Sequence, residues 1–193
     1  MITFYATCIV DQFLPEIGES AFFLLEKTGE KIYYPETITC CGQPHFNNGY
    51  REEAAEILKK QIDSLEGEGP IVVPSGSCSW MLKYALPTLF TDDPLLHKKA
   101  IRISERVIEF TQFIHKTGLL ENKKLLPGKT TYHDSCHLLR GLGESESPRK
   151  CLETTCEEVV ELKDSDRCCG FGGSFCLKFP EISSEMLEQK IDK

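Results

Sequence analysis

Apolar positions in the first part of the chain alternate between the spacing of strands and the spacing of helices. Short apolar and β-branched runs at Ile2–Thr7, Lys31–Thr39 and Pro70–Pro74 are typical of strands. Between them, apolar residues recur every three or four positions in Phe13–Lys27 and Arg51–Leu65. This spacing predicts two helices, each with one apolar face.

The rest of the chain repeats this plan. A long helical pattern over Leu95–Thr117 leads to a linker at Thr117–Lys129, and strands are predicted at Thr130–His133 and Glu157–Leu162 before a helix over Pro180–Lys193. Strands that alternate with helices predict an α/β fold, here two pseudo-repeated lobes with mainly parallel sheets. We place the first lobe at residues 1–117 and the second at 118–193.

Two cysteine triplets with the same spacing lie on this plan. In the first, 31 residues separate Cys8 from the adjacent pair Cys40 and Cys41; in the second, 31 residues separate Cys136 from the pair at 168–169. The copies are offset by 128 residues, and a glycine follows each pair. This register indicates a tandem duplication with one thiol-rich site in each half. The motif cysteines follow predicted strands, and in parallel sheets sites form beyond the carboxyl ends of strands.

Adjacent cysteines favour one kind of site over another. A single tetrahedral zinc is usually held by spaced pairs, whereas neighbouring thiolates can reach different irons of a cluster. The glycines beside the pairs let backbone N–H groups approach cluster sulfur, and Gly170–Ser174 has the composition of an anion-binding nest. The plainer alternative is that these glycines only mark turns.

Composition narrows the class of protein. The formal net charge of the 193 residues is −8, which argues against nucleic acid and anionic membranes as partners. We find no signal peptide and no run near the ~18 apolar residues of a membrane-spanning helix, so we expect a cytoplasmic protein with no transmembrane segment. In the cytoplasm the ten cysteines should stay reduced. Cysteine clusters in this compartment more often bind metal or take part in catalysis than form disulfides. No nucleotide or flavin motif occurs in the sequence.

Four blocks of the sequence resemble the tandem cysteine-rich CCG domain family, and within it the lactate-utilisation A group. The blocks are Cys40-Cys-Gly-Gln-Pro44, Pro74-Ser-Gly-Ser-Cys78, His133-Asp-Ser-Cys136-His137 and Cys168-Cys-Gly-Phe-Gly-Gly173. The resemblance spans nearly the whole chain. The wider family includes the cysteine-rich subunit of heterodisulfide reductase, whose motifs each bind a non-cubane [4Fe–4S] cluster through five cysteines.

This resemblance implies two sets of cofactor ligands. The first is Cys8, Cys40, Cys41 and Cys78, and the second starts with Cys136, Cys168 and Cys169. Where the family motif has a fifth cysteine in the first set, this chain has Met81, so we expect a four-thiolate [4Fe–4S] cluster or another metal. At the repeat offset the counterpart of Cys78 falls beyond Lys193, so we expect the second set to be incomplete, with Cys176 as a possible substitute.

Other cysteines and histidines have separate expected roles. Cys151 and Cys156 have no counterparts in the repeat and are expected to pack as unligated thiols. Three histidines close to the motif cysteines are either ligands, donors to the site, or partners of local backbone: His45, His133 and His137.

The resemblance implies an iron–sulfur electron-transfer subunit of a cytosolic complex that oxidises L-lactate to pyruvate, with B- and C-type proteins as partner subunits. No residue has the pattern of a general base for lactate, so no catalytic residue is assigned, and we expect a subunit that carries electrons. The alternative, from a different class, is a zinc-stabilised structural or interaction module of an oxidoreductase complex; Met81 favours it. Disulfide exchange by the pairs is a weaker alternative, because a bridge between adjacent cysteines is strained.

Overall fold

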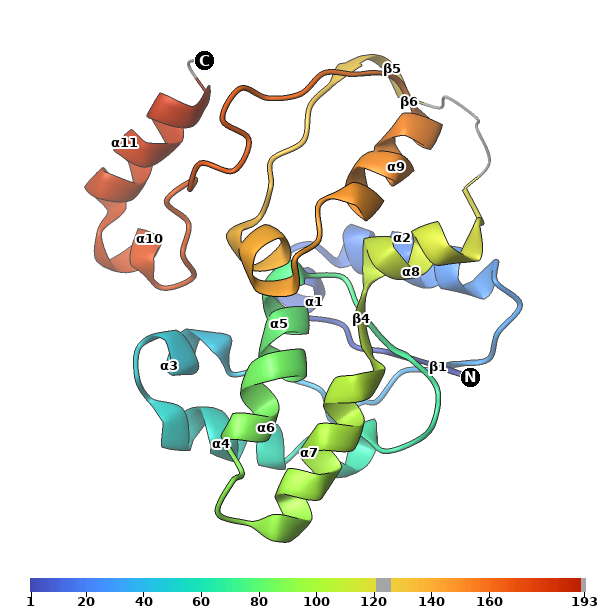
Figure 1. Cartoon of the computed structure of the whole chain (residues 1–193), viewed down its shortest axis with the longest axis vertical. Coiled ribbons are helices and arrows are strands. Elements are labelled where there is room, and N and C mark those ends of the chain that lie inside the picture. The colour runs from blue at the N-terminus through green and yellow to red at the C-terminus, as the bar shows by residue number, and fades with distance from the viewer. Residues whose placement is uncertain (121–125, 192–193) are drawn as a thin grey trace. The chain divides into compact units, whose positions relative to one another are not determined.

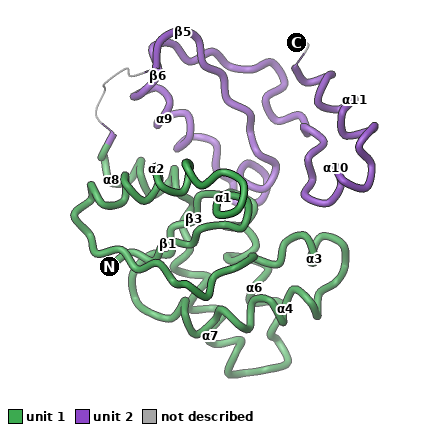
Figure 2. Tube along the Cα trace, turned by 180° about the vertical axis from the view of Figure 1, so that it is seen from behind, with its two compact units in different colours: residues 1–119 green, residues 120–193 purple. Residues whose placement is uncertain are grey.

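The computed structural model describes residues 1–120 and 126–191, which form a mixed α/β structure with parallel sheets (Figure 1). The chain divides into two compact units, Met1–Leu119 and Leu120–Lys193 (Figure 2). The predicted α/β class with mainly parallel strands is confirmed. No helix of the described ranges is both long enough and apolar enough to cross a bilayer.

A four-stranded parallel sheet forms the centre of the first unit. Its order is β2 (Ile32–Tyr33), β1 (Ile2–Phe4), β3 (Ile71–Val73) and β4 (Val107–Glu109). Strand β1 pairs with both β2 and β3, so it lies between them. Because the strands are parallel, their carboxyl ends meet at one edge of the sheet, and the loops that follow β1, β2 and β3 start side by side.

Helices cover both faces of this sheet. Figures 1 and 2 show α2 (Pro15–Glu26) and α8 (Phe110–Thr117) on one face, and α4 (Arg51–Lys59) and α7 (Pro94–Arg106) on the other. Every residue of β1 and β3 is buried, as expected for parallel strands covered on both sides. The shorter helical segments of this unit are α1 (Cys8–Phe13), α3 (Gln43–Asn47), a 3₁₀ turn (Asp63–Leu65), α5 (Gly76–Trp80), a π-helical turn (Met81–Ala85) and α6 (Leu86–Thr88).

Proline residues explain why one predicted strand and one predicted helix have the wrong boundaries. The strand predicted over Lys31–Thr39 is wrong beyond Tyr33, because Pro35 has no N–H for the ladder and the chain leaves the sheet at its edge. The helix predicted over Phe13–Lys27 is instead the end of α1 followed by α2. Pro15 occupies the first turn of α2, where a missing N–H costs nothing.

The single long helix predicted over Leu95–Thr117 is also wrong. It is interrupted by β4, whose β-branched residues pair with β3 through Val107 and Ile71. Glu109 ends the strand and caps α8 by accepting hydrogen bonds from the N–H groups of Thr111 and Gln112. The predicted helix over Arg51–Leu65 is confirmed as far as Lys59, after which the chain turns into the 3₁₀ segment.

A parallel pair of strands, β5 (Leu126–Thr130) and β6 (Cys156–Val159), organises the second unit. Its helical segments are a π-helical turn (His137–Gly141), α9 (Glu146–Thr155), α10 (Phe175–Lys178) and α11 (Pro180–Ile191). The strand predicted over Thr130–His133 is wrong, because β5 ends where that prediction starts. Pro127 and Gly128, assigned to a linker, lie in β5 beside a register shift, where proline is tolerated. Part of that linker, residues 121–125, lies outside the described residues.

A buried ion pair fixes the loop that carries Cys136. The guanidinium of Arg149 donates to both carboxylate oxygens of Asp134, at 2.8 and 2.7 Å, and also to Glu161. Asp134 is 4% exposed and accepts a further hydrogen bond from the hydroxyl of Ser165. The pair with Arg149 lowers the pKa of Asp134. Asp134 therefore joins the segments before Cys136 and before Cys168.

A buried lysine fixes the neighbouring loop. Lys190, on α11, is 5% exposed, and its ammonium donates to the carbonyl oxygens of Ser165 at 2.9 Å and Arg167 at 2.6 Å. A third carbonyl, that of Asp164, lies at 3.5 Å. These contacts satisfy the buried ammonium and attach the residues just before Cys168 to α11.

Arg149→Met should destabilise the second unit by about 2 kcal/mol at neutral pH. The loss is below the ~3–5 kcal/mol of fully buried pairs because Arg149 keeps some solvent contact. Hydrogen exchange of amides in residues 126–191 measures it. Because the folded pKa of Asp134 is lowered, the pair stabilises at pH above the usual carboxyl range, and the difference should shrink below about pH 4.

Lys150→Met is the matched control. Lys150 directly follows Arg149 on α9, and its ion pair with Glu153 is exposed to solvent. It should leave exchange almost unchanged. Equal effects of the two substitutions would contradict the structural role given to the Asp134 pair.

Candidate metal centre

Four cysteines of the first unit converge at the carboxyl edge of its sheet. Cys8 begins α1 after β1, Cys40 and Cys41 lie between β2 and α3, and Cys78 lies in α5 after β3. The Sγ atoms of Cys8 and Cys40 are 3.8 Å apart, and those of Cys41 and Cys78 are 3.1 Å apart. Cys41 and Cys78 are buried, whereas Cys8 and Cys40 are partly exposed. We call these four residues the thiol cluster.

Hydrogen bonds divide the thiol cluster into donors and acceptors. Contacts with Cys41 and Cys8, together with the N–H of Gly42, lower the pKa of Cys40 to about 2. The Cys41 thiol, followed by the hydroxyls of Ser75 and Ser77, lowers the pKa of Cys78. The pKa values of Cys8 and Cys41 are raised, chiefly by the bonds that they donate. The hydrogen bonds therefore favour loss of the proton from Cys40 and Cys78 over its loss from Cys8 and Cys41, and a metal would displace the protons that remain.

A buried glutamine holds the loop that carries the adjacent pair. The amide nitrogen of Gln61 donates to the carbonyl oxygens of Cys40 at 2.9 Å and Ile57 at 3.0 Å. Its amide oxygen accepts from the hydroxyl of Tyr5 at 3.1 Å and from the N–H of Thr39 at 3.4 Å. The prediction missed Gln61 and Tyr5. A polar residue among the apolar positions of the helix after Arg51 was the available signal.

Gly42 has a backbone that an ordinary side chain would disturb. Its φ is +78°, and a Cβ there would lie 3.2 Å from the carbonyl oxygen of Ala54 on α4. This close approach leaves the Gly42 N–H 3.4 Å from the Sγ of Cys40, to which it donates. The expectation that the glycine brings an N–H group to the thiols agrees with this contact.

The second unit reproduces the same local structure. The N–H of Gly170 donates to the Sγ of Cys168 at 3.4 Å, its φ is +80°, and a Cβ there would lie 2.7 Å from the carbonyl oxygen of Ser183 on α11. Burial, and then the neighbouring Cys168 and Cys169, raise the pKa of Cys136. The second triplet is thus brought together too. The described part of this unit has counterparts of β1 and β2 but none of β3 or Cys78.

The three remaining cysteines lie in other settings. Cys176, the possible substitute ligand, lies in α10 and donates to the carbonyl oxygen of Gly173 at 3.2 Å. Cys156 is fully buried in β6, and Cys151 lies in α9. Cys176 is thus engaged within its own turn.

The histidines near the motifs differ from one another. His133 places Nδ1 3.3 Å from the carbonyl oxygen of Ser165, a local backbone contact, and burial lowers the pKa of His137. His45, on α3, has a buried Nδ1 atom without any hydrogen-bond partner, the one such side-chain atom of the described residues. The charge of His45 also contributes to the lowered pKa of Cys40. An orphaned nitrogen beside a thiol cluster indicates a group that binds there.

The chemistry of the thiol cluster fits a thiophilic metal or a metal–sulfur cluster. Sulfur donors select zinc, copper(I) or iron–sulfur clusters over hard cations. Backbone and hydroxyl donors to the sulfur atoms are the contacts that tune such sites. In the described ranges, no group of three or more His, Cys, Asp or Glu side chains is arranged ready to hold a metal ion, and the thiols instead bond to one another in pairs. Binding of a metal would require at least the closer pair, Cys41 and Cys78 at 3.1 Å, to separate.

Known proteins share both the domain and the full length of the chain. The cysteine-rich CCG domain matches residues 2–83 and 130–193. Lactate utilization protein A of Geobacillus thermodenitrificans is 40% identical over 193 residues, which cover 99% of this chain and 80% of that protein. The Anoxybacillus flavithermus protein of the same name is 42% identical over 192 residues, covering 98% and 80%. The chain belongs to the cysteine-rich CCG family and, within it, to the lactate utilization protein A group.

Gly42→Ala should reduce metal retention by the first unit, whereas Gly49→Ala should not. Both residues have positive φ, so both substitutions cost about 1 kcal/mol in backbone strain. Only at Gly42 does a Cβ meet a neighbouring backbone; at Gly49 nothing lies within 4 Å. The metal content per chain after reconstitution measures the loss of binding, and urea unfolding measures the loss of stability. Together they separate these two effects. Equal metal loss at equal stability would refute the role given to the Gly42 contact.

Proposed function

We propose that the chain is an electron-transfer subunit that holds an iron–sulfur cluster on Cys8, Cys40, Cys41 and Cys78. The observation that carries this proposal is the convergence of these four thiols from three separate loops, with N–H and hydroxyl donors directed at their sulfur atoms. When bound, such a cluster would accept and release single electrons. The lactate utilization protein A group supports a role in lactate utilisation.

The exposure of the cluster residues suits this role. Cys8 and Cys40 are partly exposed, so one side of the site faces outward, while buried Cys41 and Cys78 anchor it to the core. Burial and the four neighbouring cysteines raise the pKa of Tyr5, which keeps its phenol protonated as a donor to Gln61. These residues fix the thiols and limit solvent on the inner side of the site.

Cys41→Ser should remove most of the iron and sulfide that the whole chain binds at its first unit after reconstitution. The substitution deletes one of four thiols, and metal affinity depends on a complete ligand shell. Cys151→Ser is the matched control, because Cys151 lies on α9, outside both triplets. Iron and sulfide analysis with visible absorption after anaerobic reconstitution measures the loss. Equal losses from both variants would show that the ligand assignment is wrong.

Zinc is the second candidate, and one distance favours it. Four thiolates at the usual zinc–sulfur distance of about 2.3 Å would have Sγ atoms about 3.8 Å apart. The Cys8 and Cys40 sulfurs already have a separation of 3.8 Å. A zinc site would make the chain a structural or interaction module of an oxidoreductase complex. Zinc-loaded protein is colourless, so absorption together with metal analysis decides between the two.

We further propose that lactate oxidation requires B- and C-type partner proteins, so this chain alone should not reduce a dye with L-lactate as donor. The reason is that lactate oxidation removes two electrons and protons, and the sequence has no flavin or nicotinamide motif. Dye reduction by this chain, by its partners, and by the mixture tests this. Turnover by the chain alone would contradict the proposal.

A further inference from the structure

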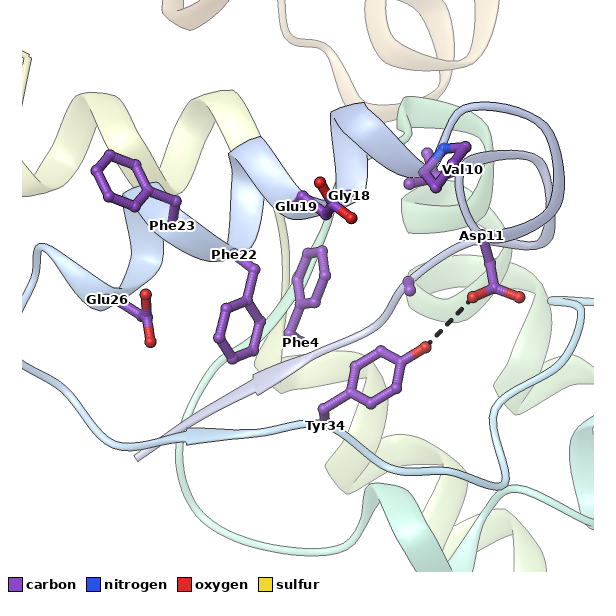
Figure 3. Close-up of a pocket in the computed structure, with 11 residues that line it drawn as sticks. Phe4, Val10, Asp11, Gly18, Glu19, Phe22, Phe23, Glu26 and Tyr34 are labelled. Atoms are coloured by element: carbon purple, nitrogen blue, oxygen red, sulfur yellow. Dashed lines mark hydrogen bonds between the residues drawn. The ribbon is translucent and has the colours of Figure 1, made fainter.

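A cavity of about 530 Å³ lies in the first unit, away from the four cysteines, which do not line it. It is formed by β1, the helices α1 and α2, and the segment after β2 (Figure 3). Its volume is within the range of sites for small molecules. The proposed electron-transfer role does not use it.

The walls of the cavity are aromatic. Phe4 packs against Phe22 edge to face, with ring centroids 6.1 Å apart, and against Tyr34, with centroids 6.3 Å apart. Phe23 is 54% exposed at the same cavity. Figure 3 shows the rings of Phe4, Phe22 and Tyr34 gathered in the middle of the group. Such rings present negative faces that attract cations.

The charged side chains of the cavity are all acidic. Asp11, Glu19 and Glu26 line it, and none of the described lining residues is basic. In Figure 3 the carboxylates of Asp11 and Glu26 lie at opposite ends of the group, with Glu19 between them. No ion pair recorded for the described residues involves any of the three.

The helix α2 sets the spacing of two of these charges. Glu19 and Glu26 are two turns apart on one face, so their Cα atoms are separated by about 10 Å along the axis, with Phe22 and Phe23 between them. Positive charges separated by methylene spacers would match this order of acid, aromatic and acid. A single compact cation would meet only one of the carboxylates.

One local contact agrees with this preference for cations, and a second connects Tyr34 with Asp11. The ammonium of Lys27 lies 4.5 Å from the centroid of the Phe23 ring, so this ring already contacts a positive charge within the chain. The Tyr34 hydroxyl is 3.5 Å from Asp11, and burial followed by the charge of Asp11 raises the pKa of Tyr34.

We propose that this cavity binds a linear aliphatic polyamine. The methylene segments of the ligand lie against the four aromatic rings, and its ammonium groups meet the carboxylates along the groove. None of the four cysteines lines this site, although α1 carries both Cys8 and the lining residues Val10 and Asp11.

Isothermal titration of the full, reduced chain with spermidine tests the proposal. We expect saturable binding at one site, and a three- to tenfold loss of affinity in the double variant E19Q/E26Q, since exposed charge pairs each contribute modestly. Glu16→Gln is the matched control, because Glu16 is on the same helix but does not line this cavity. It should retain the affinity of the unchanged chain. The thermal midpoints of all variants establish that they are folded.

Two further ligands separate the contribution of the apolar chain from that of the positive charges. Octane-1,8-diol, which has the apolar chain without charge, should bind at least tenfold more weakly than spermidine, and so should octylamine, which has a single charge. Equal weakening by Glu16→Gln would show non-specific attraction to an acidic surface and overturn the proposal. So would binding of octylamine as tight as that of spermidine, or the absence of saturation.

Discussion

The parallel pairing of β1 with both β2 and β3 is the constraint on which the thiol cluster depends. It brings three loops to one edge of the sheet although they are separated by more than thirty residues in sequence. Helices on both faces bury these strands and hold them in place. Without this arrangement, Cys8, Cys41 and Cys78 would belong to unrelated loops, and no common ligand could reach them.

The duplication preserves a small structural unit as well as a cysteine spacing. In both halves, a glycine with positive φ follows the pair, donates its N–H to the first sulfur of that pair, and lies against the backbone of a following helix. The surroundings of the two copies differ. The neutral amide of Gln61 holds the first loop, whereas the Asp134–Arg149 pair and the ammonium of Lys190 hold the second. The loop that carries the cysteine pair therefore has the same local structure in both units, although a neutral amide holds it in one and charged side chains hold it in the other.

The sequence indicated one thiol-rich site in each half, because the cysteine spacing is repeated and the motif cysteines follow predicted strands. It did not predict β4, since Val107–Glu109 is too short to interrupt a helical pattern until its pairing with β3 is known. It also overestimated β2, where Pro35 and the edge of the sheet decide the length. Gln61 differed from its neighbours only as a polar residue among apolar helix positions, and Lys190 gave no signal, because the loops whose carbonyl oxygens they bind are distant in the sequence. Spacing alone does not select the metal either, since zinc and iron clusters share thiolate ligands.

X-ray absorption at the iron edge of the anaerobically reconstituted chain tests the central claim most directly. We expect iron in an all-sulfur first shell with a second shell of iron neighbours, both lost when the thiols of the first unit are replaced. Iron as isolated ions without iron neighbours, or a shell dominated by oxygen and nitrogen, would contradict an iron–sulfur cluster on Cys8, Cys40, Cys41 and Cys78.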